Sequence, residues 1–372
     1  MLIDMSRKYL FFIPGMPLGG AERVMSTLAN NFVKNGDSVR ILTMKAPDCA
    51  YELDPRVEIT GAYASFQMSS PVKAVKSVIS VIKGISVYKK QLKEYQPDLV
   101  LSFLSYTNLI AIRFGRRSGI PVVVSERCDP LKRNKIIMKL DNRYYPKADC
   151  IVCQSKTIEA YFKNVNPASK TTVIANPLNS LVYNTEKIKN REKKIIAAGR
   201  LSDQKNYTLL IRAFSQIADK FPDFRVNIFG QGPEKENLEK LIAELNLQNR
   251  VFLMGTKQNV MKEEADSSLY VMSSDYEGFP NALAEAMASG LPVISTDFPS
   301  GVAHEIIENG KNGFVVPVGD VDALAKAMDA VLSDPSLQET MSVNNEAIRE
   351  QLSEERVCGI WKNLFNSLTD KR

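Results

Sequence analysis

The sequence predicts an α/β protein built from two Rossmann-like domains that face each other across a cleft. Its 372 residues exceed one ordinary hydrophobic core, at roughly 100 to 200 residues per domain. Hydrophobic residues make up 44% and charged residues 24% of the chain, which is typical of globular proteins and excludes disordered or fibrous ones. Short β-rich apolar runs alternate with helix-length segments, and this order indicates parallel sheets covered by helices.

The first domain is expected at residues 1–184. Its first strand, Tyr9 to Ile13, leads into a turn with Gly19 and Gly20, and a helical pattern follows over 21–33. Further strands are predicted at 39–44, 99–103, 122–125 and 150–153. Cys150 and Cys153 form a CxxC inside the last of these runs, and we interpret them as packing residues because no second pair follows.

The second domain is expected at residues 185–352, after a polar linker at 185–194. Its strands are predicted at 195–198, 225–229, 251–254, 269–272, 292–295 and 313–316. Residues 353–372, which include Trp361, are predicted to form a helix that crosses back to the first domain. Parallel sheets bind ligands at the carboxyl ends of their strands, so the site is expected in the cleft.

Charge is distributed unevenly along the chain. Residues 1–185 carry 26 Lys and Arg against 14 Asp and Glu, a net +12, whereas residues 186–372 carry 22 against 28, a net −6. The first half is therefore expected to attract nucleic acid, anionic lipid or a phosphorylated substrate. Nucleic acid is disfavoured because no base-reading module is recognisable. Five thinly spread cysteines fit a reducing cytoplasm, and no apolar run reaches the roughly 20 residues of a membrane span or forms a signal peptide.

The basic region includes a predicted helix at 71–93. On a helical wheel Lys73, Lys76, Lys83 and Lys90 share one face, opposite an apolar face. A solvated crossover helix would have the same pattern. The alternative is a surface for anionic lipid or a lipid diphosphate, favoured by nearby cations: Arg116, Arg117, Lys132, Arg133, Lys135 and Lys139.

Two glutamates eight positions apart are the first candidate site. Pro280 suits a helix first turn, so Glu277 precedes a helix that contains Glu285. The helix start would offer the free amides of Asn281 and Ala282 to an anion between the two carboxylates. A nucleotide diphosphate with a sugar at each end has this layout, although such a spacing also occurs on solvated helix faces.

Three further features follow strands or the linker. Arg200 and Lys205 lie on the loop after the first strand of the second domain and are suited to a diphosphate. Gly230 and Gly232 form a tight turn after the next strand, where a ribose or base edge could approach the backbone. Asn176 and Pro177 lie near the linker.

In this order the motifs resemble the retaining glycosyltransferases of family 4, which have the GT-B fold. The resemblance covers about residues 9–330 and includes all the landmarks: Gly19-Gly20-Ala21-Glu22, Asn176-Pro177, Gly199-Arg200, Lys205-Asn206, Gly230-x-Gly232 and Glu277-x7-Glu285. It implies that Arg200 and Lys205 bind the donor diphosphate and that Glu285 holds the ribose. It also implies donor-sugar contacts from these residues: Glu277, Gly278, Phe279, Gly19 and Gly20.

The resemblance implies transfer of a hexose or N-acetylhexosamine from a nucleotide sugar, for which we favour UDP, without a metal. The expected acceptor is a saccharide on a lipid diphosphate, in bacterial polysaccharide assembly at the cytoplasmic face of the cell membrane. Alternatives are a sugar-nucleotide epimerase and a catalytically silent donor-binding subunit.

One position departs from the family pattern. Arg127 stands where many members have a histidine near the sugar, and its pKa above 12 excludes a general base. Whether Glu126, Arg127 or Asp129 orients the acceptor hydroxyl stays open.

Other motifs are interpreted as structural. His304, the only histidine, is expected to be structural or solvated. Asp320-x-Asp322 precedes an amphipathic run, so Asp320 is predicted to be a helix N-cap rather than a metal ligand. Gly19-Gly20 lacks the spacing of a dinucleotide fingerprint.

Overall fold

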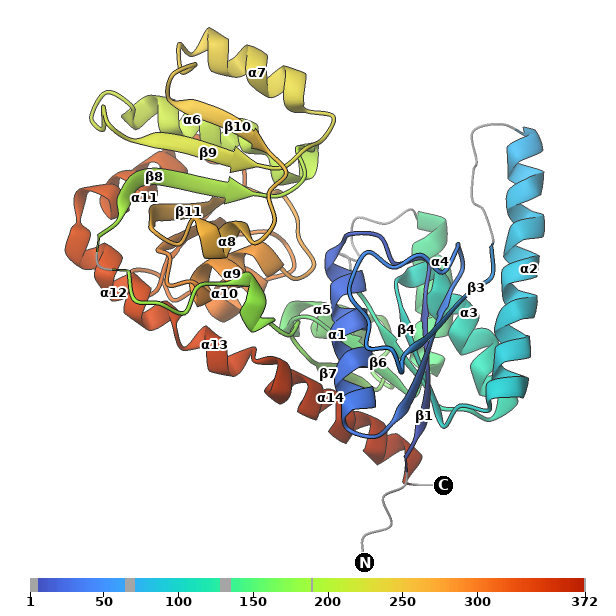
Figure 1. Ribbon diagram of the computed structural model, residues 1–372. Coiled ribbons are helices and arrows are strands. Elements are labelled where there is room, and N and C mark those ends of the chain that lie inside the picture. Colours follow the sequence, from blue (N-terminus) through green and yellow to red (C-terminus); the bar gives the residue numbers. More distant parts are fainter. Residues whose placement is uncertain (1–5, 64–70, 128–134, 189, 371–372) are drawn as a thin grey trace, which may run out of the picture. The chain divides into compact units, whose positions relative to one another are not determined.

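The computed structural model describes residues 6–63, 71–127, 135–188 and 190–370, and the chain forms two compact units (Figure 1). The first unit consists of Met1–Pro177 and Glu354–Arg372, and the second of Leu178–Ser353. The first boundary therefore lies at Pro177 rather than at residue 184. The reason is local, because the Leu178 amide donates to the Leu352 carbonyl at 2.7 Å and so already belongs to the second unit.

The first unit contains a seven-stranded parallel sheet with the order β3-β2-β1-β4-β5-β6-β7. Its strands are β1 Lys8–Ile13, β2 Ser38–Thr43, β3 Glu58–Gly61, β4 Leu99–Phe103, β5 Val122–Ser125, β6 Cys150–Cys153 and β7 Thr171–Val173. The sequence did not predict β3 and β7. Both are short edge strands that are only partly buried, so neither carries an apolar run.

Helices cover both faces of this sheet. They are α1 Gly20–Lys34, α2 Pro71–Tyr95, α3 Ser105–Gly115, α4 Lys135–Tyr144, α5 Lys156–Val165 and α14 Glu354–Thr369. Successive side chains of a strand point to opposite faces, so Tyr9 and Phe11 pack with α1 and α14. Leu10 and Phe12 pack with α2, α3 and α5. Trp361 of α14 is fully buried in the first of these clusters.

The second unit contains a six-stranded parallel sheet with the order β10-β9-β8-β11-β12-β13. Its strands are β8 Glu192–Ala198, β9 Arg225–Phe229, β10 Val251–Gly255, β11 Ser267–Met272, β12 Val293–Thr296 and β13 Phe314–Val316. β8 begins inside the segment predicted as a linker. Lys194 is buried there because its ammonium lies 3.0 Å from Glu264 and 2.9 Å from Asp266, so a charged stretch becomes part of a strand.

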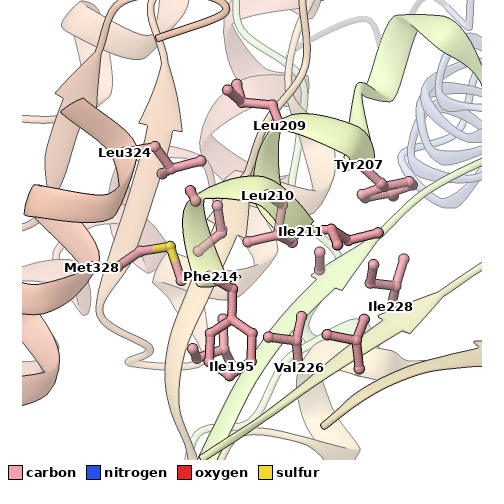
Figure 2. Close-up of a cluster of buried hydrophobic side chains, with 14 of the residues drawn as sticks. Ile195, Tyr207, Leu209, Leu210, Ile211, Phe214, Val226, Ile228, Leu324 and Met328 are labelled. Carbon is pink, nitrogen blue, oxygen red and sulfur yellow. The ribbon is translucent and has the colours of Figure 1, made fainter. Parts of the chain in front are cut away.

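The helices of the second unit complete its fold. They are α6 Tyr207–Ile217, α7 Lys235–Glu244, α8 Val260–Glu263, α9 Asn281–Ala288, α10 Val302–Ile306, α11 Val321–Ser333, α12 Pro335–Asn345 and α13 Ile348–Gln351. Figure 2 shows Leu210 and Phe214 of α6 among strand residues such as Ile195 and Val226 in one buried cluster with Met328 of α11. This packing supports the loop between β8 and α6.

In both sheets the strand order reverses beside the first strand, between β1 and β4 and between β8 and β11. Ligands of doubly wound sheets bind at such switch points, outside the carboxyl ends of the strands. The loops after β8 and β11 are therefore the first place to look for a site in the second unit, and the loops after β1, β4 and β5 in the first.

Candidate active site

The loops after β8 and β11 are tied together by polar side chains. Asn206 adopts a left-handed backbone conformation (φ 43°), and its side chain accepts a hydrogen bond from the Leu209 amide at 3.2 Å. The same side chain donates to Asp275 Oδ1 at 2.7 Å. The Asp275 amide in turn donates to the Gln204 carbonyl at 2.8 Å. The start of α6 thus fixes the loop after β11 against the loop after β8.

Lys205 and Glu277 meet inside this frame. The Lys205 ammonium lies 2.6 Å from Glu277 Oε1, and the exposed fractions of the two side chains are 18% and 10%. Gln204 Nε2 donates to the Tyr276 carbonyl at 2.8 Å and lies 3.4 Å from Glu277 Oε2. The structure therefore brings together two of the predicted residues and adds Gln204, which sequence reasoning missed because only the tertiary contact reveals it.

Arg200 lies on the same loop and has a different environment. Its side chain is exposed, and within the part of the chain that the structure describes it has no hydrogen bond or ion pair. An exposed guanidinium offers five donors in a planar fork that matches phosphate geometry. Arg200 and the Lys205–Glu277 pair thus give this edge of the sheet one accessible cation and one partly buried ion pair.

The glycines at 230 and 232 allow two loops to touch. A Cβ at Gly230, whose φ is 147°, would lie 1.8 Å from the Gly199 carbonyl oxygen, and one at Gly232 would lie 2.1 Å from the Leu201 carbonyl oxygen. The sequence predicted that these glycines would admit a ribose or base edge. In the structure the space beside them is filled by the backbone of 199–201, so they position the Arg200 loop.

The glutamate pair is arranged as predicted along the chain. Glu277 precedes α9, and Glu285 lies within it. Burial raises the pKa of the Tyr270 hydroxyl well above its usual value, and Tyr207, Glu277 and Glu285 raise it further. Both glutamates therefore contribute to the electrostatic environment of this buried tyrosine of β11.

One expectation about the start of α9 is wrong. The Asn281 amide donates to the Phe279 carbonyl at 3.0 Å, so it is not free for an anion. Pro280 occupies the N-cap position with φ −82° and ψ 74°, a geometry that turns the Phe279 carbonyl toward this amide. Phe279 itself is buried, whereas Gly278 and Ala282 are partly exposed.

In the first unit, Glu126 and Arg127 follow β5, and both side chains are buried. Glu126 is 0% exposed and accepts hydrogen bonds from the Tyr145 hydroxyl at 2.8 Å and the Arg127 amide at 3.0 Å. Of the three candidates for orienting the acceptor hydroxyl, Glu126 therefore has a carboxylate that is hydrogen-bonded within the protein interior. The third candidate, Asp129, lies outside the described residues.

Arg127 is a buried cation of the first unit. Its guanidinium carbon lies 3.9 Å from the centre of the Phe103 ring and 5.8 Å from that of Trp361, and Nη1 donates to Asn176. Among the described residues Nε and Nη2 have no hydrogen-bond partner. Burial lowers its pKa to about 9, because a charge is costly in a poorly solvated site. The guanidinium thus lies against core aromatics, and its role as one of the three candidates for orienting the acceptor hydroxyl stays a prediction.

The glycine loop after β1 is held at Gly19. Gly19 is extended, with φ −178° and ψ 163°, and both its amide and its carbonyl are hydrogen-bonded to the Tyr51 hydroxyl, at 2.9 and 2.7 Å. Gly20 is the first residue of α1. The sequence identified the two glycines but not Tyr51, which is 32 positions away from Gly19.

The helix predicted at 71–93 is present in the structure as α2, Pro71–Tyr95. Lys83 and Lys90 are exposed, and the Lys90 ammonium lies 3.7 Å from Glu94 Oε1. Lys73 and Lys76 belong to α2, but their side chains lie outside the described part of the structure.

The structural interpretations of three other motifs are confirmed. Asp320 Oδ1 accepts the Ala323 amide at 2.8 Å and caps α11. Cys150 and Cys153 are buried in β6. His304 is exposed, with Nε2 3.2 Å from Asp297 Oδ2.

Two family models together match most of the chain. Residues 18–180 match the model of Glycosyltransferase Family 4, and residues 183–348 match that of Glycosyl transferases group 1. The chain is 31% identical over 355 residues to the N-acetylgalactosamine-N,N'-diacetylbacillosaminyl-diphospho-undecaprenol 4-alpha-N-acetylgalactosaminyltransferase of Campylobacter jejuni, covering 89% of this chain and 92% of that one.

Two solved structures share the fold. Sucrose-phosphate synthase from Thermosynechococcus elongatus superposes with a TM-score of 0.84 at 20% identity, over 98% of this chain and 100% of that one. Anabaena HepE in complex with UDP superposes with a TM-score of 0.79 at 20% identity, over 97% of this chain and 100% of that one. The chain therefore belongs to the glycosyltransferases that combine these two domains, and its fold is GT-B. Within the described ranges, no helix is long and apolar enough to span a membrane.

Proposed function

We propose that this glycosyltransferase moves a hexose or N-acetylhexosamine from a UDP-sugar to a saccharide carried on a lipid diphosphate, with retention at the anomeric carbon, in bacterial glycan assembly. The observation that carries the proposal is the Lys205–Glu277 ion pair beside the exposed Arg200, at the switch point of the second sheet. A relative named for action on an undecaprenol-linked saccharide and a neighbour solved with UDP support the two substrate classes.

Arg200 and Lys205 are assigned to the donor diphosphate. Lys205 is paired with Glu277 without a ligand, so donor binding exchanges that carboxylate for phosphate oxygens as the partner of the ammonium. Glu277 is then released toward the donor sugar while remaining next to Gln204. Glu285 is assigned to the ribose hydroxyls. Two cations at the leaving group stabilise the charge that develops on the diphosphate.

The proposed transfer needs no protein base. The acceptor oxygen bonds to the anomeric carbon on the face from which the UDP oxygen departs, and the acceptor hydroxyl proton passes to that departing phosphate oxygen. The products are the glycoside and UDP. We assign no metal to this step, because Asp320 of the Asp320-x-Asp322 motif is a helix cap. Activity is accordingly expected to persist in excess EDTA.

The first unit is assigned to the acceptor and to an anionic membrane surface at the cytoplasmic face. α2 exposes Lys83 and Lys90 together with Ile82, which is 58% exposed. α4 contributes two apolar side chains, Ile137 and Leu140, each 41% exposed and flanked by exposed Lys139 and Arg143. Exposed apolar residues interleaved with cations are typical of helices that lie in a bilayer interface. Each cation near an anionic surface contributes about 1 kcal/mol.

Incubation with a panel of labelled nucleotide sugars, with and without a lipid-diphosphate saccharide, tests the proposal. Label transferred to lipid only when acceptor is present is the expected result. Conversion of the donor sugar to an epimer without acceptor would identify an epimerase instead. Saturable UDP binding without turnover of any donor would identify a silent donor-binding subunit.

A further inference from the structure

We propose that Tyr51 is the positioning residue of the glycine loop in the first unit, a role that rests on the proposed sugar transfer. The glycine loop is residues 14–19, between β1 and α1. It includes two exposed residues, Pro17 and Leu18, the latter 80% exposed. A loop with glycines and an exposed tip has several accessible backbone conformations unless neighbouring groups select one.

A short strap, residues 49–54, provides those groups. Met16 and Cys49 form an isolated parallel bridge, and the Ala50 amide donates to the Met16 carbonyl at 2.8 Å. Farther along, the strap is tied to α1, because Asn30 Nδ2 donates to the Glu52 carbonyl at 3.0 Å and Asn30 Oδ1 accepts the Asp54 amide at 2.8 Å. The strap is thus fixed at both ends, and Tyr51 projects from a fixed backbone.

The Tyr51 hydroxyl acts on both peptide groups that flank Gly19. It accepts from the Gly19 amide at 2.9 Å and donates to the Gly19 carbonyl at 2.7 Å. One oxygen can do both because Gly19 is fully extended, and in an extended residue the N–H and C=O point to the same side. A hydroxyl has one donor and two acceptor sites, so it matches this pair of groups. Both peptide planes are held at once, and neither can rotate without breaking a hydrogen bond.

The Glu22 side chain packs against the other side of Gly19. A Cβ at position 19 would lie 2.3 Å from Glu22 Oε2, so this carboxylate packs directly against Gly19. Burial raises the pKa of Glu22, which agrees with a carboxyl group enclosed by the loop rather than solvated. The loop is therefore held between Tyr51 and Glu22. The Gly19 carbonyl also accepts the Arg23 amide at 3.1 Å, so the orientation of Gly19 is coupled to the first turn of α1.

Loss of the Tyr51 hydroxyl should therefore lower turnover without weakening the binding of the donor diphosphate. The proposed diphosphate ligands, Arg200 and Lys205, belong to the second unit, so loosening Gly19 should leave nucleoside diphosphate affinity unchanged. The family resemblance assigns Gly19 to the transferred sugar, and misplacement of a reacting group by about 1 Å can cost a hundredfold in rate.

Tyr51→Phe tests the assignment, because it removes the hydroxyl and keeps the ring. Tyr161→Phe is the matched control, since the Tyr161 hydroxyl contacts Asn142 at 3.5 Å at an exposed position of the same unit. We expect faster amide hydrogen exchange at residues 15–20 in Tyr51→Phe, a turnover number about 10- to 100-fold lower, and a UDP dissociation constant within about twofold of the parent. The control should match the parent in all three readouts.

The outcomes separate this inference from the proposed function. If the parent transfers sugar and Tyr51→Phe has the same turnover number, Tyr51 is not a positioning residue and the proposed function stands. If turnover falls together with UDP affinity and melting temperature, the hydroxyl only maintains the fold, and the inference is overturned. If the parent transfers no sugar from any donor, the proposed function fails and takes this inference with it.

Discussion

Lys205 in the second unit and Arg127 in the first are both cations that follow an inner strand of a parallel sheet. Lys205 is partly buried and lies 2.6 Å from a carboxylate. Arg127 is 8% exposed and lies over Phe103, with two guanidinium nitrogens that have no partner among the described residues. A cation that holds a replaceable carboxylate can exchange it for phosphate. Arg127 instead lies over aromatic rings and donates to Asn176, so we assign different roles to the same type of position in the two units.

Removing the cations of the second unit should have the largest effect. We expect Lys205→Ala and Arg200→Ala each to reduce kcat/KM about ten- to 150-fold, because a charge-assisted hydrogen bond contributes about 1.5 to 3 kcal/mol. Calorimetry with UDP should show weaker binding in both variants. Lys240→Ala, an exposed lysine of α7, is the matched control. Unchanged UDP affinity in Lys205→Ala and Arg200→Ala would remove these residues from the donor site.

The two glutamates should differ in their kinetic signatures. Glu285→Ala is expected mainly to raise the donor dissociation constant, about tenfold for one hydrogen bond to a sugar. Glu277→Gln is expected mainly to lower kcat by at least tenfold, because Glu277 is assigned to the reacting sugar. Steady-state kinetics with varied donor measures both parameters. Equal loss of kcat in the two variants would contradict the division of roles.

Removing the cations of α2 should have an effect of intermediate size, on membrane binding. We expect a fourfold variant to lose nearly all co-sedimentation with anionic vesicles, because each cation contributes about 1 kcal/mol. The variant carries Lys→Glu at Lys73, Lys76, Lys83 and Lys90. The double variant Ile137→Ser with Leu140→Ser should weaken vesicle binding further at salt concentrations above the physiological one. There the screening length falls below about 8 Å, so attraction between charges contributes less.

The matched control for this surface is Lys235→Glu with Lys240→Glu, which reverses two exposed charges on α7 of the second unit. UDP affinity should be the same in all variants. If the fourfold variant binds vesicles and glycosylates lipid acceptor like the parent, α2 is a solvated crossover helix.

The smallest effect on activity is expected at Arg127. The buried Glu126 carboxylate interacts electrostatically with Arg127, and removing one charge of such a pair leaves the other buried without compensation. We therefore expect Arg127→Met to keep transfer within about threefold of the parent but to unfold at a lower denaturant concentration. Arg127→Ala should be less stable, since it leaves a cavity beside Trp361. A hundredfold loss of kcat in a stable Arg127→Met variant would return Arg127 to the reaction.

The sequence was sufficient for the features that local patterns determine. The apolar runs predicted the inner strands of both sheets, and the order of motifs predicted the fold and the family. Edge strands β3 and β7 were missed because half-exposed strands carry no apolar run. The start of β8 was missed because the burial of Lys194 depends on acidic partners 70 and 72 positions along the chain.

The candidate site residues could be chosen from the sequence, but their contacts could not. Arg200, Lys205, Glu277 and Glu285 were chosen from their places after strands and in a helix, and their roles stay predictions. Gln204, Tyr51 and the enclosure of Arg127 depend on contacts between distant segments, such as Tyr51 with Gly19 or Arg127 with Trp361. A single sequence does not encode such contacts in any local pattern, so they appear only in the folded chain.

The anomeric configuration of the product is the most direct test of the proposed reaction. Proton NMR of the glycoside formed from a UDP-α-sugar and a lipid-diphosphate saccharide, in excess EDTA, should show an α linkage. A β linkage would contradict the assignment of a retaining transfer in which UDP itself accepts the proton. Loss of all product in EDTA, restored by magnesium or manganese, would contradict the absence of a metal from the step.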